Sequence, residues 1–307
     1  MPPKEKTMPE ITLALGGGGS KGFAHLGVLR VLEEQGYRVR AVAGTSAGAI
    51  IGALYAAGYN AEEVTAWVES VPERAFQRHP DNGPSLMGLA GVEAMLRQAL
   101  EERTFADLPI PFGAVAVDIF KGRTVYLRRG LVVEAVLASS AVPGIFPPRE
   151  RNGRLLVDGG VMDNVPVRLA RLLAPHLPVV AVSLTPPPER LGDPTGVRML
   201  AKVPILNQLA GRLRLGQAFN IFLRAIDIGG AWMTHIRLQL DQPEVLITPD
   251  VAQVGLLDQV DIRAVAAIGE VAAREALPQL EAATSTWAAW RRRLKPTPLN
   301  LNDVEVL

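Results

Sequence analysis

Cysteine is absent from the 307 residues of the chain, and only four histidines occur, namely His25, His79, His176 and His235. The absence of cysteine excludes a disulfide framework, a thiolate metal site and a cysteine nucleophile. The four histidines are too widely separated along the sequence to indicate a histidine-rich metal centre. We therefore expect no bound metal.

A large excess of charge of one sign is also lacking, because 32 lysines and arginines accompany 31 acidic residues. Nucleic-acid-binding proteins usually carry a strongly basic face, so nucleic acid is not an expected partner. No apolar run reaches about 18 residues, the length that predicts a transmembrane helix. The first ten residues are charged and lack the apolar segment of a signal peptide. We expect a soluble globular protein of the cytoplasm.

Segments with the apolar pattern of buried strands alternate with segments of helical pattern. The expected strands are residues 11–15, 38–43, 112–120, 124–128, 155–157 and 179–184. The expected helices are residues 21–35, 46–57, 60–71, 92–103, 132–140, 167–173 and 262–280. This alternation predicts an α/β fold, a three-layer α/β/α sandwich with a mainly parallel central sheet. No linker divides the chain, so we expect one domain over residues 10–283 and a basic, aromatic, frayed tail over residues 284–307.

A glycine-rich loop joins the first expected strand to the first expected helix. Residues 17–22 (Gly-Gly-Gly-Ser-Lys-Gly) fit the dinucleotide pattern G-x-G-x-x-G. That pattern also requires an acidic residue at the end of the next strand, where residues 42–45 have no carboxylate. A phosphate-binding P-loop requires the order Gly-Lys-Ser/Thr, which the sequence does not have. Both nucleotide interpretations fail, and we expect no cofactor.

Four consecutive glycines, at positions 16–19, still need an explanation. Without Cβ atoms, such a loop can turn several backbone N–H groups towards one point, and the helix that follows adds its own unpaired N–H groups. This arrangement favours a developing negative charge. The alternative is a tight strand-to-helix turn, which would need only one or two glycines.

Residues 44–48 (Gly-Thr-Ser-Ala-Gly) match the pattern G-x-S-x-G between an expected strand and an expected helix. In a nucleophile elbow of this kind the serine hydroxyl is exposed on a strained turn. The helix N-terminus also favours negative charge on an attacking oxygen. The alternative for Ser46 is a helix N-cap without a catalytic role.

A serine nucleophile needs a base, which is usually a histidine oriented by a carboxylate. His176 precedes a buried strand, whereas active sites of parallel sheets gather at the carboxyl ends of strands. His235 has no recognisable motif around it, His25 is expected to pack or cap within the first helix, and His79 lies in a polar loop. None of the four histidines is therefore a persuasive base.

Asp158 is a different kind of candidate. It follows the expected strand 155–157 and precedes Gly159 and Gly160, so it stands at the carboxyl end of a strand with uncrowded backbone beside it. The alternative is a turn aspartate, which is a common role for Asp followed by Gly.

The three segments 17–22, 44–48 and 158–160 resemble, in order and spacing, the three signatures of patatin-like phospholipases. Residues 138–148 resemble the proline-containing segment that precedes the aspartate of this family. The resemblance extends over residues 11–184 and is greatest to the bacterial branch that is similar to the esterase domain of neuropathy target esterase. One departure is Gly16, where plant patatins have Asp.

The resemblance implies a catalytic dyad without histidine, in which Ser46 attacks a carboxylic ester and Asp158 accepts the serine proton. The implied oxyanion hole consists of backbone N–H groups of Gly17, Gly18 and Gly19. Lys21 would orient this loop or support the anion. The glycines expected to support the motifs are Gly22, Gly44, Gly48, Gly159 and Gly160.

The implied substrates are carboxylic esters of lipids, so the expected activity is that of a phospholipase A, a lysophospholipase or a carboxylesterase. Residues 198–224 and 287–293 combine apolar or aromatic residues with basic ones, which predicts transient peripheral contact with membranes. The alternatives are a core helix with a solvated arginine edge or an oligomer contact. Residues 72–89 are either a lid or a plain connection. The rival function is that of a non-enzymatic lipid-binding or regulatory protein with the same fold.

Overall fold

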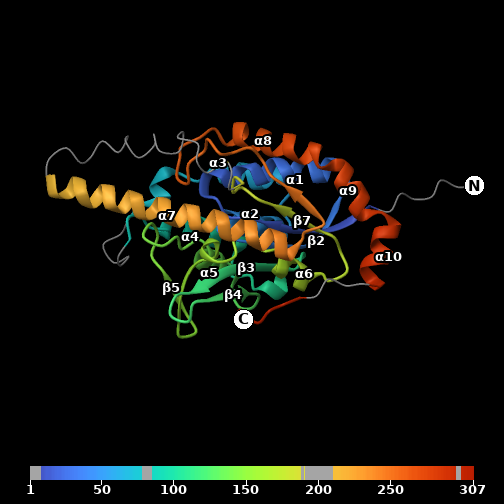
Figure 1. Ribbon diagram of the computed structural model, residues 1–307, viewed down its shortest axis with the longest axis horizontal. Helices are drawn as coiled ribbons and strands as arrows, with labels where there is room; N and C mark the ends of the chain where they lie inside the picture. Colours follow the sequence, from blue (N-terminus) through green and yellow to red (C-terminus); the bar gives the residue numbers. More distant parts are fainter. Residues whose placement is uncertain (1–7, 78–84, 188–189, 191–209, 295–298) are drawn as a thin grey trace, which may run out of the picture.

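The computed structural model describes residues 8–77, 85–187, 190, 210–294 and 299–307 (Figure 1). Its strands are β1 (Glu10–Leu15), β2 (Arg38–Gly44), β3 (Phe112–Asp118), β4 (Arg123–Leu127), β5 (Arg149–Arg151), β6 (Arg154–Asp158), β7 (Val179–Val182), β8 (Val245–Ile247) and β9 (Val304–Val306). Its helices are α1 (Ala24–Glu34), α2 (Ala47–Ala56), α3 (Ala61–Glu69), α4 (Ala90–Leu100), α5 (Val132–Ser139), α6 (Val167–Leu173), α7 (Ala210–Asp241), α8 (Ile262–Glu275), α9 (Leu277–Thr284) and α10 (Thr286–Leu294). Short 3₁₀ helices are η1 (Gly19–Phe23), η2 (Glu73–Phe76), η3 (Phe105–Asp107) and η4 (Gly159–Val161).

The strands of the described residues form one sheet of mixed direction. β1 pairs in parallel with β2 and β7, β2 pairs in parallel with β3, and β7 pairs in parallel with β8. Antiparallel pairs join β3 to β4, β3 to β6 and β5 to β6. The predicted mainly parallel α/β sheet is therefore confirmed, with an antiparallel part around β3.

Helices cover both faces of the sheet. Neighbouring residues of a strand point to opposite faces, so consecutive residues of β1 show what packs on each face. In β1, Leu13 and Leu15 belong to the larger core cluster, which includes residues of α1, α2 and α8. Ala14 belongs to a smaller core cluster with Leu169 of α6, and Leu238 of α7 packs against that cluster. The helices on the two faces form the outer layers of the predicted α/β/α sandwich (Figure 1).

Helix α8 packs closely against α1, the helix that follows the glycine loop. A Cβ on Gly27 would come within 1.8 Å of the Ala266 carbonyl oxygen, and one on Gly269 within 1.9 Å of the Ala24 carbonyl oxygen. These two glycines are needed for the close approach of the helices. The contact holds the start of α1 in place from the carboxyl-terminal part of the chain.

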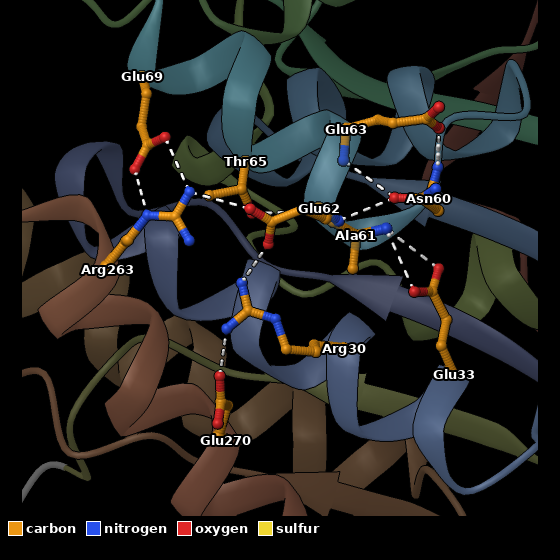
Figure 2. A network of polar contacts seen from close by, with 10 residues as sticks. All are labelled: Arg30, Glu33, Asn60, Ala61, Glu62, Glu63, Thr65, Glu69, Arg263 and Glu270. Carbon is orange, nitrogen blue, oxygen red and sulfur yellow. Dashed lines mark hydrogen bonds and ion pairs between the residues drawn. The ribbon is translucent and has the colours of Figure 1, made fainter.

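Ion pairs on the outer surface join α1, α3 and α8 (Figure 2). Arg30 of α1 lies between Glu62, at 2.9 Å, and Glu270, at 2.5 Å. Arg263 of α8 lies between Glu62, at 2.9 Å, and Glu69, at 2.7 Å. Most of these side chains are well exposed, and exposed ion pairs contribute little to stability. We therefore expect these pairs mainly to align the helices.

The carboxyl-terminal region differs from the sequence prediction. The single helix expected over 262–280 is divided into α8 and α9, because Pro278 in the first turn of α9 has no N–H to continue the earlier helix. The expected frayed tail is wrong in its last residues, since β9 pairs in parallel with β4 and Glu305 forms an ion pair with Arg154. The domain boundary between residues 283 and 284 stays a prediction.

Four further elements, β5, α7, β8 and α10, were not predicted from the sequence. α7 is a helix of 32 residues that crosses the front of the molecule in Figure 1. In the described part of the chain, no helix combines the length and the apolar character needed to span a bilayer.

Candidate active site

The sheet brings the end of β2 towards the end of β6. The register places β4 along one edge of β3, opposite Ala114 to Asp118. On the other edge, Gly44 at the end of β2 is paired with Ala114, and Asp158 at the end of β6 is paired with Ala116. Since β2 and β6 run in opposite directions along this edge, their carboxyl ends meet. Ser46, which follows β2, and Asp158, which ends β6, therefore lie close together.

Ser46 stands on a strained turn between β2 and α2. Its φ of 55° lies in the left-handed region, which costs a residue other than glycine about 1–3 kcal/mol. The side chain makes no capping hydrogen bond to the helix, so the N-cap alternative does not account for it. The Ser46 N–H instead donates to the Oγ of Ser139 at the end of α5, at 3.0 Å. The hydroxyl of Ser46 is thus not occupied in holding the helix.

Crowding around this turn explains the flanking glycines of the motif. A Cβ on Gly44 would meet the Gly48 carbonyl oxygen at 2.4 Å, and a Cβ on Gly48 would meet the Leu15 carbonyl oxygen at 2.2 Å. A Cβ on Gly22 would lie 2.6 Å from the Cβ of Ala47. These contacts leave no room for a side chain where the glycine loop, the elbow and α2 pack together.

The glycine loop runs directly past Ser46. A Cβ on Gly17 would lie 3.1 Å from the Cβ of Ser46 and 2.6 Å from Oδ1 of Asn164. The Gly17 N–H donates to the Asn164 carbonyl at 3.1 Å, so it is not the free oxyanion donor that the sequence analysis expects. For the N–H groups of Gly18 and Gly19, we find no hydrogen-bond acceptor among the described residues. These two groups are the remaining candidates.

The structure places the other predicted loop residue, Lys21, in η1. Its backbone N–H donates to the Gly18 carbonyl at 3.2 Å. This hydrogen bond turns the chain into the first helical segment directly after the glycines. A role of the Lys21 side chain in orienting the loop or supporting an anion stays a prediction.

Asp158 is buried, and one of its carboxylate oxygens is fixed. Its Oδ1 accepts a hydrogen bond from the Gly160 N–H at 2.7 Å. Its Oδ2 is buried without a hydrogen-bond partner in the part of the chain that the structure describes. Burial raises the pKa of Asp158 from 3.8 to about 6, although the nearby Ser46 hydroxyl and the Gly160 N–H both lower it. The free oxygen is therefore an acceptor of unusual basicity for a carboxylate.

Gly159 and Gly160 allow the chain to pack closely beside Asp158. A Cβ on Gly159 would come within 2.4 Å of the Val115 carbonyl oxygen of β3. A Cβ on Gly160 would lie 3.0 Å from Oδ1 of both Asp158 and Asn164. The glycines allow the chain after β6 to turn tightly against β3 and the neighbouring loop.

None of the three described histidines is placed as a partner of Ser46. His25 is fully buried and lies 2.7 Å from the Gly16 carbonyl oxygen through its Nε2, and burial lowers its pKa to about 4. His176 is exposed, and His235 contacts Gln239 on α7 at 3.0 Å. His79 lies outside the described residues.

Several supporting residues were missed by the sequence analysis. Ser139 holds the elbow, and Asn164 joins the loop after Asp158 to the glycine loop through the Gly17 N–H. The Thr45 hydroxyl donates to the Asp163 carbonyl at 3.0 Å, and the Asp163 carboxylate accepts from the Tyr126 hydroxyl at 2.9 Å. A signal for Ser139 was present, because it lies in the segment 138–148 that resembles the family. The other three hydrogen bonds join residues too distant in sequence to be paired from it.

The expected lid can be followed only in part, since residues 78–84 lie outside the described part. Beyond them, Leu86 N–H donates to the Gly144 carbonyl at 3.3 Å and Met87 N–H to the Ile145 carbonyl at 2.9 Å. The choice between a lid and a plain connection stays open as a prediction.

The fold and the site define a class of α/β proteins in which a serine on a strained strand-to-helix turn lies beside a glycine loop and a buried aspartate. Residues 13–171 match the family model described as patatin-like phospholipase. The chain belongs to the patatin-like phospholipase family, as its sequence motifs predict.

Relatives agree with the predicted branch of the family. An uncharacterised NTE family protein of Mycobacterium tuberculosis is 40% identical over 162 residues, which are 52% of this chain and 45% of that protein. A second one from the same species is 31% identical over 274 residues, covering 86% of this chain and 46% of that protein. Patatin-like phospholipase domain-containing protein 7 of Rattus norvegicus is 31% identical over 187 residues, 57% of this chain and 13% of that protein. The chain thus spans less than half of the length of these relatives.

A solved structure shares the overall arrangement. The crystal structure of VipD from Legionella pneumophila superposes with a TM-score of 0.52 at 13% identity, covering 98% of this chain and 71% of that chain. At this identity the likeness shows the fold alone. It supports the α/β sandwich and adds nothing on substrates.

Proposed function

We propose that this chain is a serine acyl hydrolase that cleaves carboxylic ester bonds of lipids, with Ser46 as nucleophile and Asp158 as base. The observation that carries the proposal is the buried carboxylate of Asp158: its Oδ2 has no hydrogen-bond partner among the described residues, and the Ser46 hydroxyl is close enough to the carboxylate to lower its pKa. A carboxylate with a pKa near 6 is a better base than one with the ordinary value, because proton transfer is most effective when the pKa approaches the working pH.

The reaction then proceeds in two halves. Ser46 Oγ bonds to the ester carbonyl carbon while its proton passes to Oδ2 of Asp158. The tetrahedral intermediate expels the alcohol, which takes that proton from Asp158, and an acyl-Ser46 ester remains. A water molecule attacks this ester, gives its proton to Asp158 and releases the acid, and the proton returns to Ser46.

The free N–H groups of Gly18 and Gly19 are the proposed donors to the oxyanion. They come from the loop whose Gly17 backbone touches Ser46, and the amino end of α2 adds its dipole. One such donor is worth about 3–4 kcal/mol in the transition state. Lys21 is proposed to support the loop from η1.

Lipid esters are the proposed substrates, which includes the activities of phospholipase A, lysophospholipase and carboxylesterase. Membership in the patatin-like phospholipase family supports this class. The rival function is lipid binding without catalysis. It would not require an intact Ser46, an unpartnered carboxylate oxygen on Asp158 and a glycine loop at one place, so the hydrolase is favoured.

The experiment is the hydrolysis of a p-nitrophenyl ester chain-length series, with phospholipid and lysophospholipid alongside. Ser46→Ala and Asp158→Asn are expected to abolish activity, whereas His176→Ala and His235→Ala retain it. Circular dichroism establishes that each variant is folded. A histidine variant as inactive as Ser46→Ala contradicts the dyad. A folded wild-type protein with no activity above Ser46→Ala on any ester favours the binding protein.

Transient peripheral membrane contact is the second part of the proposal, together with a cytoplasmic location. Of the two sequence segments expected to make this contact, residues 198–224 lie largely outside the described residues and side chains. The other lies on α10, where Trp287 and Trp290 are exposed and Arg291 stacks over Trp287 at 5.5 Å. Vesicle co-sedimentation that does not respond to anionic lipid content would count against this contact.

A further inference from the structure

Helix α7 presents large apolar side chains to solvent. Where its side chains are described, seven such residues are between 39% and 74% exposed. We call this set the apolar α7 face; its members are Ile221, Ile226, Ile228, Trp232, Met233, Ile236 and Leu240. At about 100° per residue these positions fall within an arc of about 160°, and they extend over about 28 Å of helix.

The side of α7 that faces the protein has smaller residues. Ala231 and Thr234 are each only 4% exposed, and Leu238 packs against the smaller core cluster. These three positions lie opposite the apolar α7 face on a helical projection. A helix that served only to cover the sheet would place its largest apolar residues inward and polar ones outward. The reversed arrangement indicates that the outer face binds something apolar.

Helix α7 itself lies next to the candidate active site. α7 packs against α6 and against η4, the short helix that begins directly after Asp158. Val161 at the end of η4 is itself 41% exposed. Figure 1 shows α7 crossing the front of the molecule, with its amino-terminal end extending beyond the other labelled elements at the left.

Charge along the sequence indicates what kind of surface would bind there. Residues 194–226, which lead into and form the first half of α7, include no Asp or Glu but contain five basic residues: Arg198, Lys202, Arg212, Arg214 and Arg224. An apolar helix face in a segment whose sequence is rich in basic residues is typical of helices that lie in a membrane interface. Anionic lipid head groups attract such segments, and tryptophan is favoured at the same depth.

We propose that the apolar α7 face docks on the surface of an anionic lipid bilayer and brings the end of β6, with Asp158, next to the membrane. The inference rests on the proposed function, because a hydrolase of membrane lipids needs access to esters that stay in the bilayer. A second copy of this chain would also cover the face, so the test includes the oligomeric state.

The test compares Trp232→Ser/Ile236→Ser with a matched control, Ile119→Ser/Phe120→Ser. The control removes two exposed apolar side chains from the turn after β3, which is a different element from α7. Binding is measured by co-sedimentation with vesicles of phosphatidylcholine and phosphatidylglycerol. We expect the α7 variant to lose at least about tenfold in partitioning, from the apolar area it no longer buries, and the control to bind like the wild type. Both variants retain wild-type hydrolysis of a short soluble p-nitrophenyl ester.

A second measurement decides between α7 and α10, the other segment proposed for membrane contact. Brominated lipids in the vesicles quench tryptophans that enter the interface. We expect Trp232→Phe to remove most of this quenching and Trp287→Phe/Trp290→Phe to preserve it. The reverse result overturns the assignment to α7.

The outcomes separate this inference from the proposed function. Equal vesicle binding by the α7 variant and the wild type overturns the inference. A wild-type protein that ignores vesicles, and whose dimer dissociates in the α7 variant, also overturns it and identifies the face as a contact between copies. A wild-type protein that binds vesicles through α7 but hydrolyses no ester contradicts the proposed function and leaves the docking surface supported.

Discussion

The backbone N–H of Ser46 donates a hydrogen bond to the Oγ of Ser139, at 3.0 Å, and both residues are buried. This bond joins the strained elbow after β2 to the carboxyl end of α5. A residue with a φ of 55° keeps that conformation only if its surroundings hold it. The Ser139 hydroxyl is one of the groups that do so, which gives a physical role to part of the segment 138–148.

The first prediction concerns this bond. Ser139→Ala leaves the Ser46 N–H buried without its acceptor, a loss that costs about 1–3 kcal/mol. We expect kcat on a soluble ester to fall about tenfold with KM nearly unchanged, because the nucleophile is misplaced while the substrate site is not altered. Steady-state kinetics at saturating and limiting ester concentrations measure both constants.

The matched control is Ser140→Ala. Ser140 is the next residue and is also buried, but its hydroxyl has no hydrogen-bond partner in the described part of the chain. Its removal should leave kcat unchanged. Equal losses in the two variants would mean that both act through general destabilisation of α5, and Ser139 would lose its positioning role.

Asp158 shows which part of the candidate site could be predicted from the sequence and which could not. The sequence predicts its position at the carboxyl end of a strand, where active sites of parallel sheets gather. The residue is at such an end, but β6 is antiparallel to β3, and the site forms because the ends of β2 and β6 meet along one edge of β3. Strand direction depends on pairing across the sheet, which the apolar pattern of one strand does not encode.

The glycine loop gives a second case. Its position between a strand and a helix was predictable, since glycine runs and apolar periodicity are local signals. Which N–H groups remain free was not predictable. The Gly17 N–H donates to the carbonyl oxygen of Asn164, a residue 147 positions away that carries no signal of this role in the sequence. The long helix α7 was missed because its large apolar residues face solvent and its small ones face the core, which is the opposite of the expected amphipathic pattern.

The second prediction is a pH profile. If Asp158 is the base, it must be deprotonated to accept the Ser46 proton. Burial raises its pKa to about 6, so kcat/KM for a soluble ester should decline tenfold per pH unit below about 6 and level off above it. Initial rates between about pH 5 and 8 give this profile for the free enzyme.

Asp163 provides the control for that profile, because burial also raises its pKa to about 6. Asp163→Asn keeps an oxygen that can accept the Tyr126 hydroxyl hydrogen bond. The decline of kcat/KM at low pH should therefore occur at the same pH in this variant as in the wild type. If the decline of kcat/KM at low pH disappears in Asp163→Asn, the group that titrates is Asp163. The pH profile would then no longer support Asp158 as the base.

The third prediction is that Asp158→Asn is more stable than the wild type at neutral pH. The pKa of Asp158 is raised in the folded state, so the free energy of unfolding is lowered as pH rises from about 4 through about 6. An amide has no such penalty. We expect a gain of about 2–3 kcal/mol at pH 8, from two pKa units at 1.36 kcal/mol each, and almost none at pH 4.

Urea unfolding of both proteins at the two pH values measures this difference. Ser46→Ala serves as the control, because it removes activity without removing the buried charge. An Asp158→Asn variant with the same gain at both pH values would show that burial of the charge is not its cause.

The fourth prediction compares two glycines that both have positive φ. Gly19 has a φ of 57°, and a Cβ there would lie 1.9 Å from the Leu256 carbonyl oxygen, which accepts the Ser20 N–H at 2.9 Å. Gly36 has a φ of 72°, and a Cβ there would meet nothing within 4 Å. Alanine costs about 1–2 kcal/mol of backbone strain at either position, but only at Gly19 must it also displace the neighbouring chain.

We therefore expect Gly19→Ala to lose at least about a hundredfold in kcat, since the displacement moves a proposed oxyanion donor away from the ester. Gly36→Ala should lose stability and keep its kcat. Ester hydrolysis well below the melting temperature of each variant separates the two effects, because both proteins are then folded. If Gly19→Ala retains the wild-type kcat, the N–H groups of this loop do not bind the oxyanion, and the donors must be sought elsewhere around Ser46.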